Sequence, residues 1–219
     1  MRKKVLLLAL ALALVLGAAG AGTYAYFQDA GHSSGNTFTS GTMDLQLCDA
    51  DEAWGNGVSA TWAIPRIAPG ETVNVIFEVG LRNTGSIAGN HVKISFQHAI
   101  DETANPVEAD TNPNSAPGDM ARYVEILQMD YNGQCLVGPS PTPGHAIIDA
   151  NGNGWLDLED VTLPANASAL DNLSVPLPGG GNAKNFHIAL GFRPEAGNDI
   201  QGDVLLTTVA FTLQQDTTL

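Results

Sequence analysis

The stretch ETVNVIFEVGLRN, residues 71–83, alternates apolar and polar side chains with a period of two. The apolar set is Val73, Val75, Phe77, Val79 and Leu81, and the polar set is Thr72, Asn74, Glu78 and Arg82. Successive side chains of a β-strand point to opposite faces of the sheet, so this pattern predicts a strand with one buried face. Turn-forming residues bracket the stretch, Ala68-Pro69-Gly70 before it and Asn83-Thr84-Gly85-Ser86 at its end.

Similar segments recur along the rest of the chain. Residues that favour strands, with alternating apolar positions, occupy 37–47, 92–98, 123–131, 186–192 and 205–213. Gly, Pro, Asn and Asp separate these segments, and no long stretch repeats apolar residues with the helical period. The pattern predicts an all-β fold, a jelly-roll-type antiparallel β-sandwich formed by residues 37–219 as a single domain. Two polar stretches, about 101–120 and 139–184, are predicted to be long loops.

The N-terminus has the organisation of an export signal. Three basic residues at 2–4 precede an apolar run over 5–21, and small residues continue to Ala25. We predict a signal peptide over 1–25, cleaved after Ala25, and a secreted protein, extracellular or on the cell surface, that begins at Tyr26. An uncleaved membrane anchor is the alternative, although a membrane span needs about 20 apolar residues and this run is shorter.

The chain is strongly acidic. It has 9 lysines and arginines against 23 aspartates and glutamates, a net charge of −14, and removal of the signal peptide takes away three positive charges. Such a protein repels nucleic acid phosphates and anionic lipids, which excludes nucleic acid as a partner and predicts no membrane contact after cleavage. Its natural counterions are cations, and Ca²⁺ is among them.

Export also makes disulfide formation possible for two cysteines and glycosylation possible for two asparagines. Cys48 and Cys135 would enter an oxidising environment, and a disulfide between them would add on the order of 4–5 kcal/mol in the chain-entropy model. The alternative is two buried thiols. Asn166-Ala167-Ser168 and Asn172-Leu173-Ser174 are N-glycosylation sequons, whose use depends on the host.

Residues 149–160, DANGNGWLDLED, fit a twelve-residue calcium-loop pattern. Its oxygen ligands would be the side chains of Asp149, Asn151, Asn153, Asp157 and Asp160 and the backbone carbonyl of Trp155. Gly154 permits the sharp turn, and Asp157 would act through a water. Asp160 stands where the EF-hand has a bidentate Glu, as in the calcium loops of dockerin-type modules. We therefore predict an EF-hand-like Ca²⁺ loop inserted in the sandwich, and the alternative is a turn that binds no ion.

Four motifs together resemble the TasA/camelysin family of exported bacterial surface proteins. The N-terminal motif is 23–29 (TYAYFQD) followed by 37–45 (TFTSGTMDL). Two turns, 67–71 (IAPGE) and 82–86 (RNTGS), bracket the strand described first. The last motif is 198–202 (NDIQG) followed by 211–215 (FTLQQ). The resemblance covers residues 1 to about 100 and 185–215, and the intervening residues do not share it.

This resemblance implies a structural subunit of an extracellular, biofilm-associated fibre. In such fibres the mature N-terminal segment leaves its own subunit and adds a β-strand to the next one. The donor strand here would be Tyr26, Phe27, Gln28, Asp29 and Ala30, within a flexible donor segment over 26–36 in which His32 to Asn36 form the flexible lead. Main-chain hydrogen bonds and side-chain pockets would hold it. The partner is then another copy of this chain, head to tail, with other matrix proteins or a polysaccharide as further candidates. The alternative is an N-terminal tail without a partner.

Catalysis has little support in the sequence, although camelysin is described as a metalloendopeptidase. The five histidines are His32, His91, His98, His145 and His187, and no pair has the H-E-x-x-H spacing of a zinc peptidase. His91 and His98 lie seven residues apart, so on one strand they face opposite sides; we interpret His91 as a solvated turn residue and His98 as an imidazole at the core edge. We predict no enzyme and no catalytic residue. A camelysin-like metalloendopeptidase and a monomeric calcium-binding surface adhesin remain the alternatives.

Overall fold

The computed structural model describes residues 41–48, 54–55, 59–64, 75–101, 120–196 and 204–216, with the backbone alone for 59–64 and 101. Contacts divide the chain into two units, 1–40 and 41–219, and every described residue belongs to the second. The predicted signal peptide, the donor segment and most of the predicted 101–120 loop lie outside the described residues. None of the helices in the described ranges is long and apolar enough to span a bilayer.

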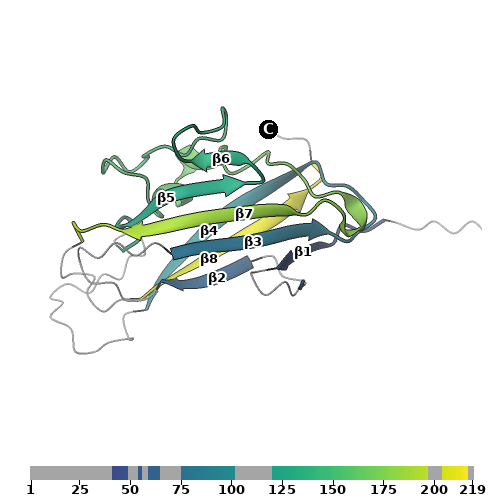
Figure 1. The fold of residues 1–219 in the computed structure, drawn as a ribbon, viewed down its shortest axis with the longest axis horizontal. Coiled ribbons are helices and arrows are strands. Elements are labelled where there is room, and N and C mark those ends of the chain that lie inside the picture. Colours follow the sequence, from purple (N-terminus) through teal and green to yellow (C-terminus); the bar gives the residue numbers. More distant parts are fainter. Residues whose placement is uncertain are drawn as a thin grey trace, which may run out of the picture. The chain divides into compact units, whose positions relative to one another are not determined.

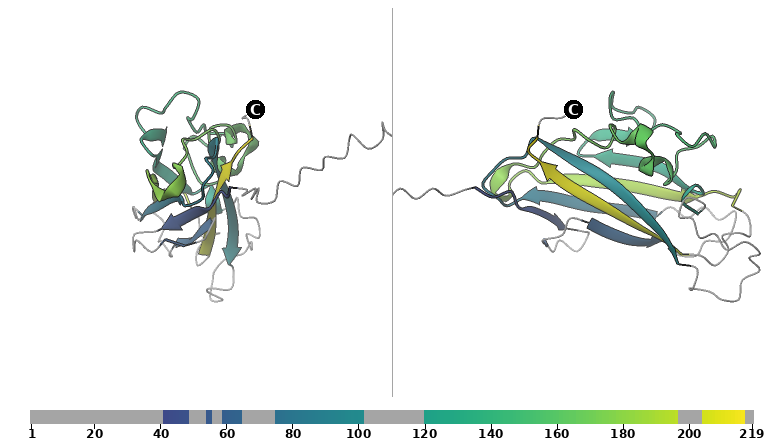
Figure 2. Two further views of the ribbon diagram at one scale, coloured as in Figure 1. Left: turned by 90° about the vertical axis from the view of Figure 1, so that its right-hand side faces the viewer. Right: turned by 180° about the vertical axis from the view of Figure 1, so that it is seen from behind.

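The described residues form two antiparallel sheets that face each other (Figures 1 and 2). The first sheet has five strands, in the order β1 (Leu45–Cys48), β3 (Val75–Asn83), β7 (Lys184–Phe192), β5 (Val124–Tyr131) and β6 (Gln134–Val137). The second has three, in the order β2 (Ser59–Ile64), β8 (Val204–Gln214) and β4 (His91–Asp101). Strands β1 to β5 alternate between the two sheets along the chain. The predicted all-β sandwich is confirmed.

Alternation along the strands builds the core between the sheets. On β3, Val79 and Leu81 are buried while Ile76 is 60% exposed, so the strand has one inner and one outer face as its sequence predicted. Phe186 on β7 lies at the centre of the core and is fully buried. Its ring centroid lies 6.4 Å from that of Phe96 on β4 and 5.3 Å from that of Phe211 on β8. These ring contacts join the two sheets.

Two strands were not predicted. Strand β2 (SATWAI) is short, and two of its six residues are alanines, which favour strands weakly. Strand β6 follows the turn Asn132-Gly133, where both residues have positive φ, 47° and 82°. An Asn-Gly pair is the typical two-residue hairpin turn, so this dipeptide was the available signal for β6.

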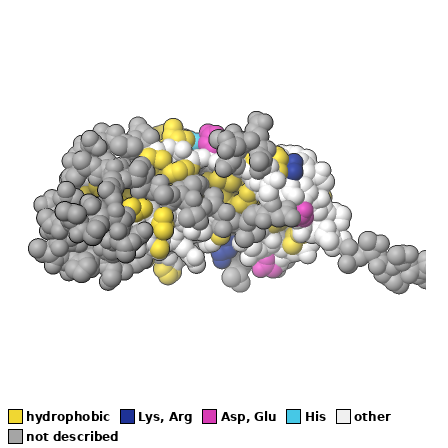
Figure 3. All heavy atoms as spheres, turned by 90° about the horizontal axis from the view of Figure 1, so that it is seen from below, with side chains coloured by type: hydrophobic (Ala, Val, Ile, Leu, Met, Phe, Trp, Pro, Cys, Tyr) yellow, Lys and Arg dark blue, Asp and Glu magenta, His cyan; other side chains and the backbone are white. Residues whose placement is uncertain are grey.

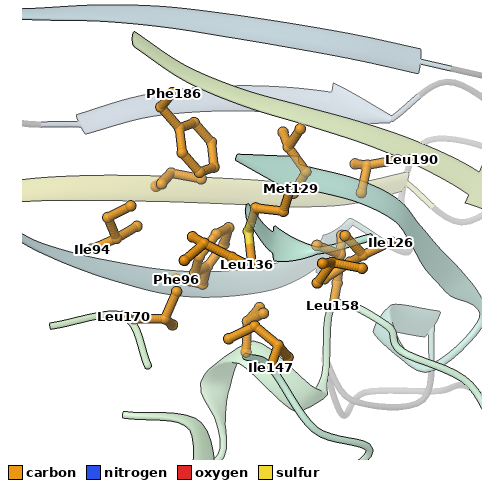
Figure 4. Packing of buried hydrophobic residues seen from close by; sticks show 14 of the residues in the cluster. Ile94, Phe96, Ile126, Met129, Leu136, Ile147, Leu158, Leu170, Phe186 and Leu190 are labelled. Atoms are coloured by element: carbon orange, nitrogen blue, oxygen red, sulfur yellow. The ribbon is translucent and has the colours of Figure 1, made fainter. Parts of the chain in front are cut away.

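Residues 142–173, named here the closing segment, join the two sheets along one side of the sandwich. Ile147 N–H donates to the Leu136 carbonyl of β6, and Ile94 N–H of β4 donates to the Leu170 carbonyl. Within the segment lie two 3₁₀-helices, η2 (Asp160–Thr162) and η3 (Pro164–Asn166); a third, η4 (Pro178–Gly180), follows it. Figure 4 shows Ile147, Leu158 and Leu170 of the segment pointing into the same interior as the β4 and β5 side chains. The predicted loop therefore contributes to the core.

The predicted Cys48–Cys135 disulfide is not formed, and the structure contradicts it. Cys48 ends β1 and Cys135 lies in β6, the two opposite edges of the five-stranded sheet. Neighbouring strands are about 4.8 Å apart, so four spacings separate the cysteines by on the order of 15–20 Å. A disulfide requires Cα atoms within about 7 Å. Sequence alone did not reveal that the two cysteines lie on opposite edges.

Replacement of Phe186 by Ala should lower the free energy of unfolding by about 3–5 kcal/mol, because it leaves a cavity between the two sheets. The matched control is Ile76→Ala on the outer face of β3, which should change stability by no more than about 0.5 kcal/mol. Urea denaturation at equilibrium measures both. Equal losses for the two variants would contradict the assignment of Phe186 to the centre of the core.

Candidate metal centre

The predicted calcium loop, residues 149–160, lies inside the closing segment, and one buried asparagine ties its two ends together. Asn166 is 1% exposed. Its Nδ2 donates to the carbonyls of Ile148 and Asp160 at 2.8 and 3.0 Å, and its Oδ1 accepts from Ile148 N–H at 2.9 Å. The amide nitrogen and the oxygen of the Asn166 side chain are therefore both engaged in hydrogen bonds in the folded protein. Asn172, the asparagine of the other sequon, is exposed.

Asp149, the first position of the loop, shapes the turn that follows it. Its Oδ1 accepts from Gly152 N–H at 2.7 Å, and its Oδ2 accepts from Gly154 N–H at 2.9 Å. Both glycines have positive φ, 74° and 100°, a conformation that other residues rarely adopt. The glycine spacing in the sequence thus matches the backbone that the turn requires.

Asp160, the twelfth position, is fully buried and binds backbone groups with both oxygens. Oδ1 accepts from the N–H groups of Ala150 and Asn151 at 2.8 and 3.1 Å, and Oδ2 accepts from Asp157 N–H at 3.1 Å. These bonds close the loop on itself. In this arrangement Asp160 stabilises the loop through its backbone N–H groups. Its role as a metal ligand stays a prediction.

Two asparagine amides face the carboxylate of Asp157 in the middle of the loop. Asn151 Nδ2 lies 3.3 and 3.2 Å from the two Asp157 oxygens, and Asn153 Nδ2 lies 2.6 Å from Oδ2. Glu159 Oε2 lies 2.9 Å from Asn151 Nδ2. An amide N–H₂ therefore occupies a position surrounded by acidic oxygens. Glu159 was not predicted to belong to this group, because it falls between the pattern's ligand positions.

The binding of a hard cation by this group stays a prediction. Asp157 is fully buried; burial raises the pKa of its carboxyl above the ordinary value, and hydrogen bonds from Asn153 and Asn151 act in the opposite direction. Rotation of the two amides would turn their oxygens toward the carboxylates, and Ca²⁺ prefers such carboxylate and amide oxygens. In the described part of the chain no three His, Cys, Asp or Glu side chains form a group that could hold a metal. A cation here would therefore depend on the amides and on the Trp155 carbonyl.

Trp155 anchors the loop to the end of the five-stranded sheet. Its indole Nε1–H donates to the Arg122 carbonyl at 2.8 Å, and the Arg193 guanidinium lies 4.5 Å from its ring centroid. Arg193 in turn pairs with Glu125 of β5 at 3.1 Å. These contacts hold position 7 of the loop, whose carbonyl is the predicted ligand, at a defined place on the sandwich.

His98 connects the loop to the three-stranded sheet. Its Nε2 lies 2.7 Å from the Leu158 carbonyl and its Nδ1 lies 3.0 Å from Thr207 Oγ1 on β8. The carbonyl only accepts, so Nε2 carries the hydrogen. Burial lowers the pKa of His98 below its ordinary value, and the bond to Leu158 partly offsets this. The predicted position of this imidazole, at the edge of the core, is confirmed.

The remaining described histidines lie apart from one another in the fold. His91 Nε2 lies 2.6 Å from Gln214 Oε1 and 3.2 Å from Asp171 Oδ1. His91 is only 3% exposed, so its interpretation as a solvated turn residue is wrong: the closing segment and the end of β8 cover it. His145 Nδ1 contacts the Ala169 carbonyl, and His187 lies on β7. The described residues therefore do not fit a catalytic metal, and we derive no peptidase step from them.

The fold and the loop define a β-sandwich protein with an oxygen-rich turn in its closing segment. The protein-family profile described as camelysin metallo-endopeptidase matches residues 1–132. The chain belongs to this family, which confirms the resemblance to TasA and camelysin. No curated protein matches the chain. The matched residues end before Asp149, so the candidate metal centre lies outside the part of the chain that the family profile matches.

Acidification should destabilise the protein through His98. Its folded pKa lies below the unfolded value of about 6.5, so the stability that neutral His98 contributes is present above pH 6.5 and is lost as the pH falls. We expect the thermal midpoint of the wild type to fall more between pH 7.5 and pH 5 than that of His98→Gln, which keeps a donor for Leu158 and does not titrate. Parallel pH profiles would contradict this role.

Proposed function

We propose that this protein is an exported structural subunit of an extracellular filament, in which the N-terminal segment of one subunit adds a β-strand to the next. The chain is a member of the camelysin family, and the match begins at residue 1 and includes the N-terminal segment. The single observation that best supports the proposal is this family match, because it includes the aromatic pair Tyr26-Phe27 as well as strands β1 to β4.

Strand addition has a clear but limited driving force. Burial of Tyr26 and Phe27 in a neighbouring subunit would contribute about 1.5–3 kcal/mol for each ring. Ordering the segment costs about 1–2 kcal/mol per residue, so a short donor strand alone binds weakly. Head-to-tail addition does not close on itself and therefore extends into a filament. The assembly must also use contacts between subunit surfaces.

Apolar side chains for such surface contacts are present. The exposed large apolar residues of the described ranges include Met43, Ile76 and Leu127, at 38%, 60% and 42% exposure. Figure 3, a view from below, shows apolar side chains of described residues at the surface, with acidic and basic ones among them. In a chain with a net charge of −14, faces with few charges are where copies can approach one another with least repulsion.

The calcium loop would stabilise the subunit. A cation between Asp157, Glu159 and the asparagine amides would offset the cost of the buried carboxylate and hold the closing segment against both sheets. The same site would serve a monomeric surface adhesin, which differs from the filament subunit in its oligomeric state. A peptidase has less support, because the described histidines each bind a different partner in a different part of the sandwich.

Filament assembly should depend on the first residues of the mature chain. The chain beginning at Tyr26 should form filaments in electron micrographs, whereas the same chain without residues 26–31 should sediment as a folded monomer, because it lacks the aromatic donor. The matched control replaces residues 31–36 with Gly and Ser, which preserves the donor and its reach. Filaments of the truncated chain would contradict strand donation, and chelator-sensitive cleavage of casein would favour the peptidase.

Calcium should bind to the loop and raise the thermal midpoint. With a dissociation constant on the order of 10⁻⁴ M, about 10 mM Ca²⁺ stabilises the folded state by roughly 2.7 kcal/mol. Asp149→Ala should abolish the calorimetric heat and the shift, since it removes the first ligand and the turn that holds the others. Glu78→Ala is the matched control, because it removes one exposed carboxylate of β3 far from the loop in the fold. Equal heats of Ca²⁺ binding for the two variants would mean that residues 149–160 form a turn that binds no ion.

A further inference from the structure

Residues 41–44, named here the strap, continue from β1 toward the N-terminus and are held by the turn 83–87. Thr42 N–H donates to Ser86 Oγ at 3.1 Å, and the Thr42 carbonyl accepts from Ile87 N–H at 3.1 Å. The Asp44 carbonyl accepts from Thr84 N–H at 2.8 Å, and the Thr84 hydroxyl also donates to the Asp44 carboxylate. Backbone groups of the strap are thus bound where an edge strand would otherwise fray.

Asn83 organises this turn from inside the protein. It is fully buried; its Oδ1 accepts from Asp44 N–H at 3.2 Å and from Gly85 N–H at 3.0 Å, while its Nδ2 donates to the Ile87 carbonyl at 2.8 Å. One amide side chain therefore fixes the turn and binds the strap at the same time. Asn83 is the last residue of β3, so the strap is attached directly to that strand.

Two glycines allow the close approach. A Cβ on Gly85 would overlap the Thr42 carbonyl oxygen, and a Cβ on Gly41 would overlap the Ile87 side chain. Beside the turn, Arg82 on β3 donates to Gln46 Oε1 of β1 at 2.7 Å. The strap and the turn are fitted to each other along their whole length, although β1 itself has only four residues.

We propose that the turn 83–87 is a positioning site for the N-terminal segment: it fixes the point at which that segment leaves the sandwich and passes tension from it to β3. This inference rests on the proposed filament function. In a filament built by strand addition, each subunit is held to its neighbour through residues N-terminal to Gly41. Any pull on that connection reaches the sandwich first at the strap.

The sheet order explains why the turn is needed. Strand β1 lies at the edge of the five-stranded sheet and pairs with β3 over four residues; beyond that it makes a single bridge, between Leu47 and Gly55. Strand β3 pairs with β7 on its other side over seven register positions, from Val75 opposite Leu190 to Leu81 opposite Lys184. The short edge strand would detach under load, whereas β3 is an interior strand. Bonding the strap to the end of β3 passes the load to the interior of the sheet.

The test uses the mature chain with the double substitution Thr84→Val and Ser86→Ala. It removes the two hydroxyl groups that bind the strap and keeps Asn83 and both glycines. The matched control is Thr212→Val with Ser95→Ala, the same chemical changes at exposed positions of the three-stranded sheet. Amide hydrogen exchange of residues 42–48, the thermal midpoint and filament length after shearing are measured for the wild type and both variants.

We expect exchange of residues 42–48 to be about tenfold faster in Thr84→Val/Ser86→Ala, since two hydrogen bonds are lost. Its filaments should fragment to shorter lengths under shear, and the thermal midpoint of the sandwich should stay close to that of the control. Unchanged exchange, or faster exchange with filaments as long as those of the control, would overturn the proposal. A wild type that forms no filaments would refute the proposed function itself, and the positioning role with it.

Discussion

Leu158 binds both sheets of the sandwich at once, and the rest of the described fold depends on this connection. Its N–H donates to the Val124 carbonyl at the start of β5, its carbonyl accepts from His98 Nε2 on β4, and its side chain is fully buried. Five strands face three, so one side of the core needs cover that strands do not provide. The closing segment supplies this cover. The candidate metal centre, residues 149–160, is part of that segment and contains Leu158. Loop geometry and core packing are therefore coupled, since a change in residues 149–160 reaches both sheets through one residue.

Much of the fold could be predicted from the sequence because period-two alternation survives in the long strands. β3, β4, β7 and β8 all bury one face, and their apolar residues follow the predicted pattern. The short strands β2 and β6 were not predicted, for a physical reason. The six residues of β2 and the four of β6 are too few for an alternating pattern of buried side chains to be distinguished from chance. The cysteine pairing failed because sequence separation does not reveal which edge of a sheet a strand occupies. His91 was misjudged because distant residues, Asp171 and the end of β8, cover it.

The turn of the candidate site could be predicted from the sequence, but the roles of its acidic residues could not. Asp149, Gly152 and Gly154 have the spacing that the turn requires, and their hydrogen bonds follow from that spacing. The division of roles among the acids depends on tertiary structure: Asp160 binds backbone N–H groups, whereas Glu159 faces Asn151. Asn166, which ties the loop ends together, appeared in the sequence only as a sequon. Its role follows from burial, which a local motif does not encode.

The sandwich and the N-terminal segment have separate physical tasks in this account. The sandwich is a unit beginning at Gly41, with its strap bonded to β3; in the proposed filament, the segment before it would provide the connection to another copy. The most direct measurement adds a synthetic peptide of residues 26–36 to the mature chain during filament growth and records filament length by electron microscopy. The peptide should occupy the acceptor site and shorten filaments saturably, while a scrambled peptide should have no effect. Filaments of undiminished length in a large excess of the peptide would contradict strand donation.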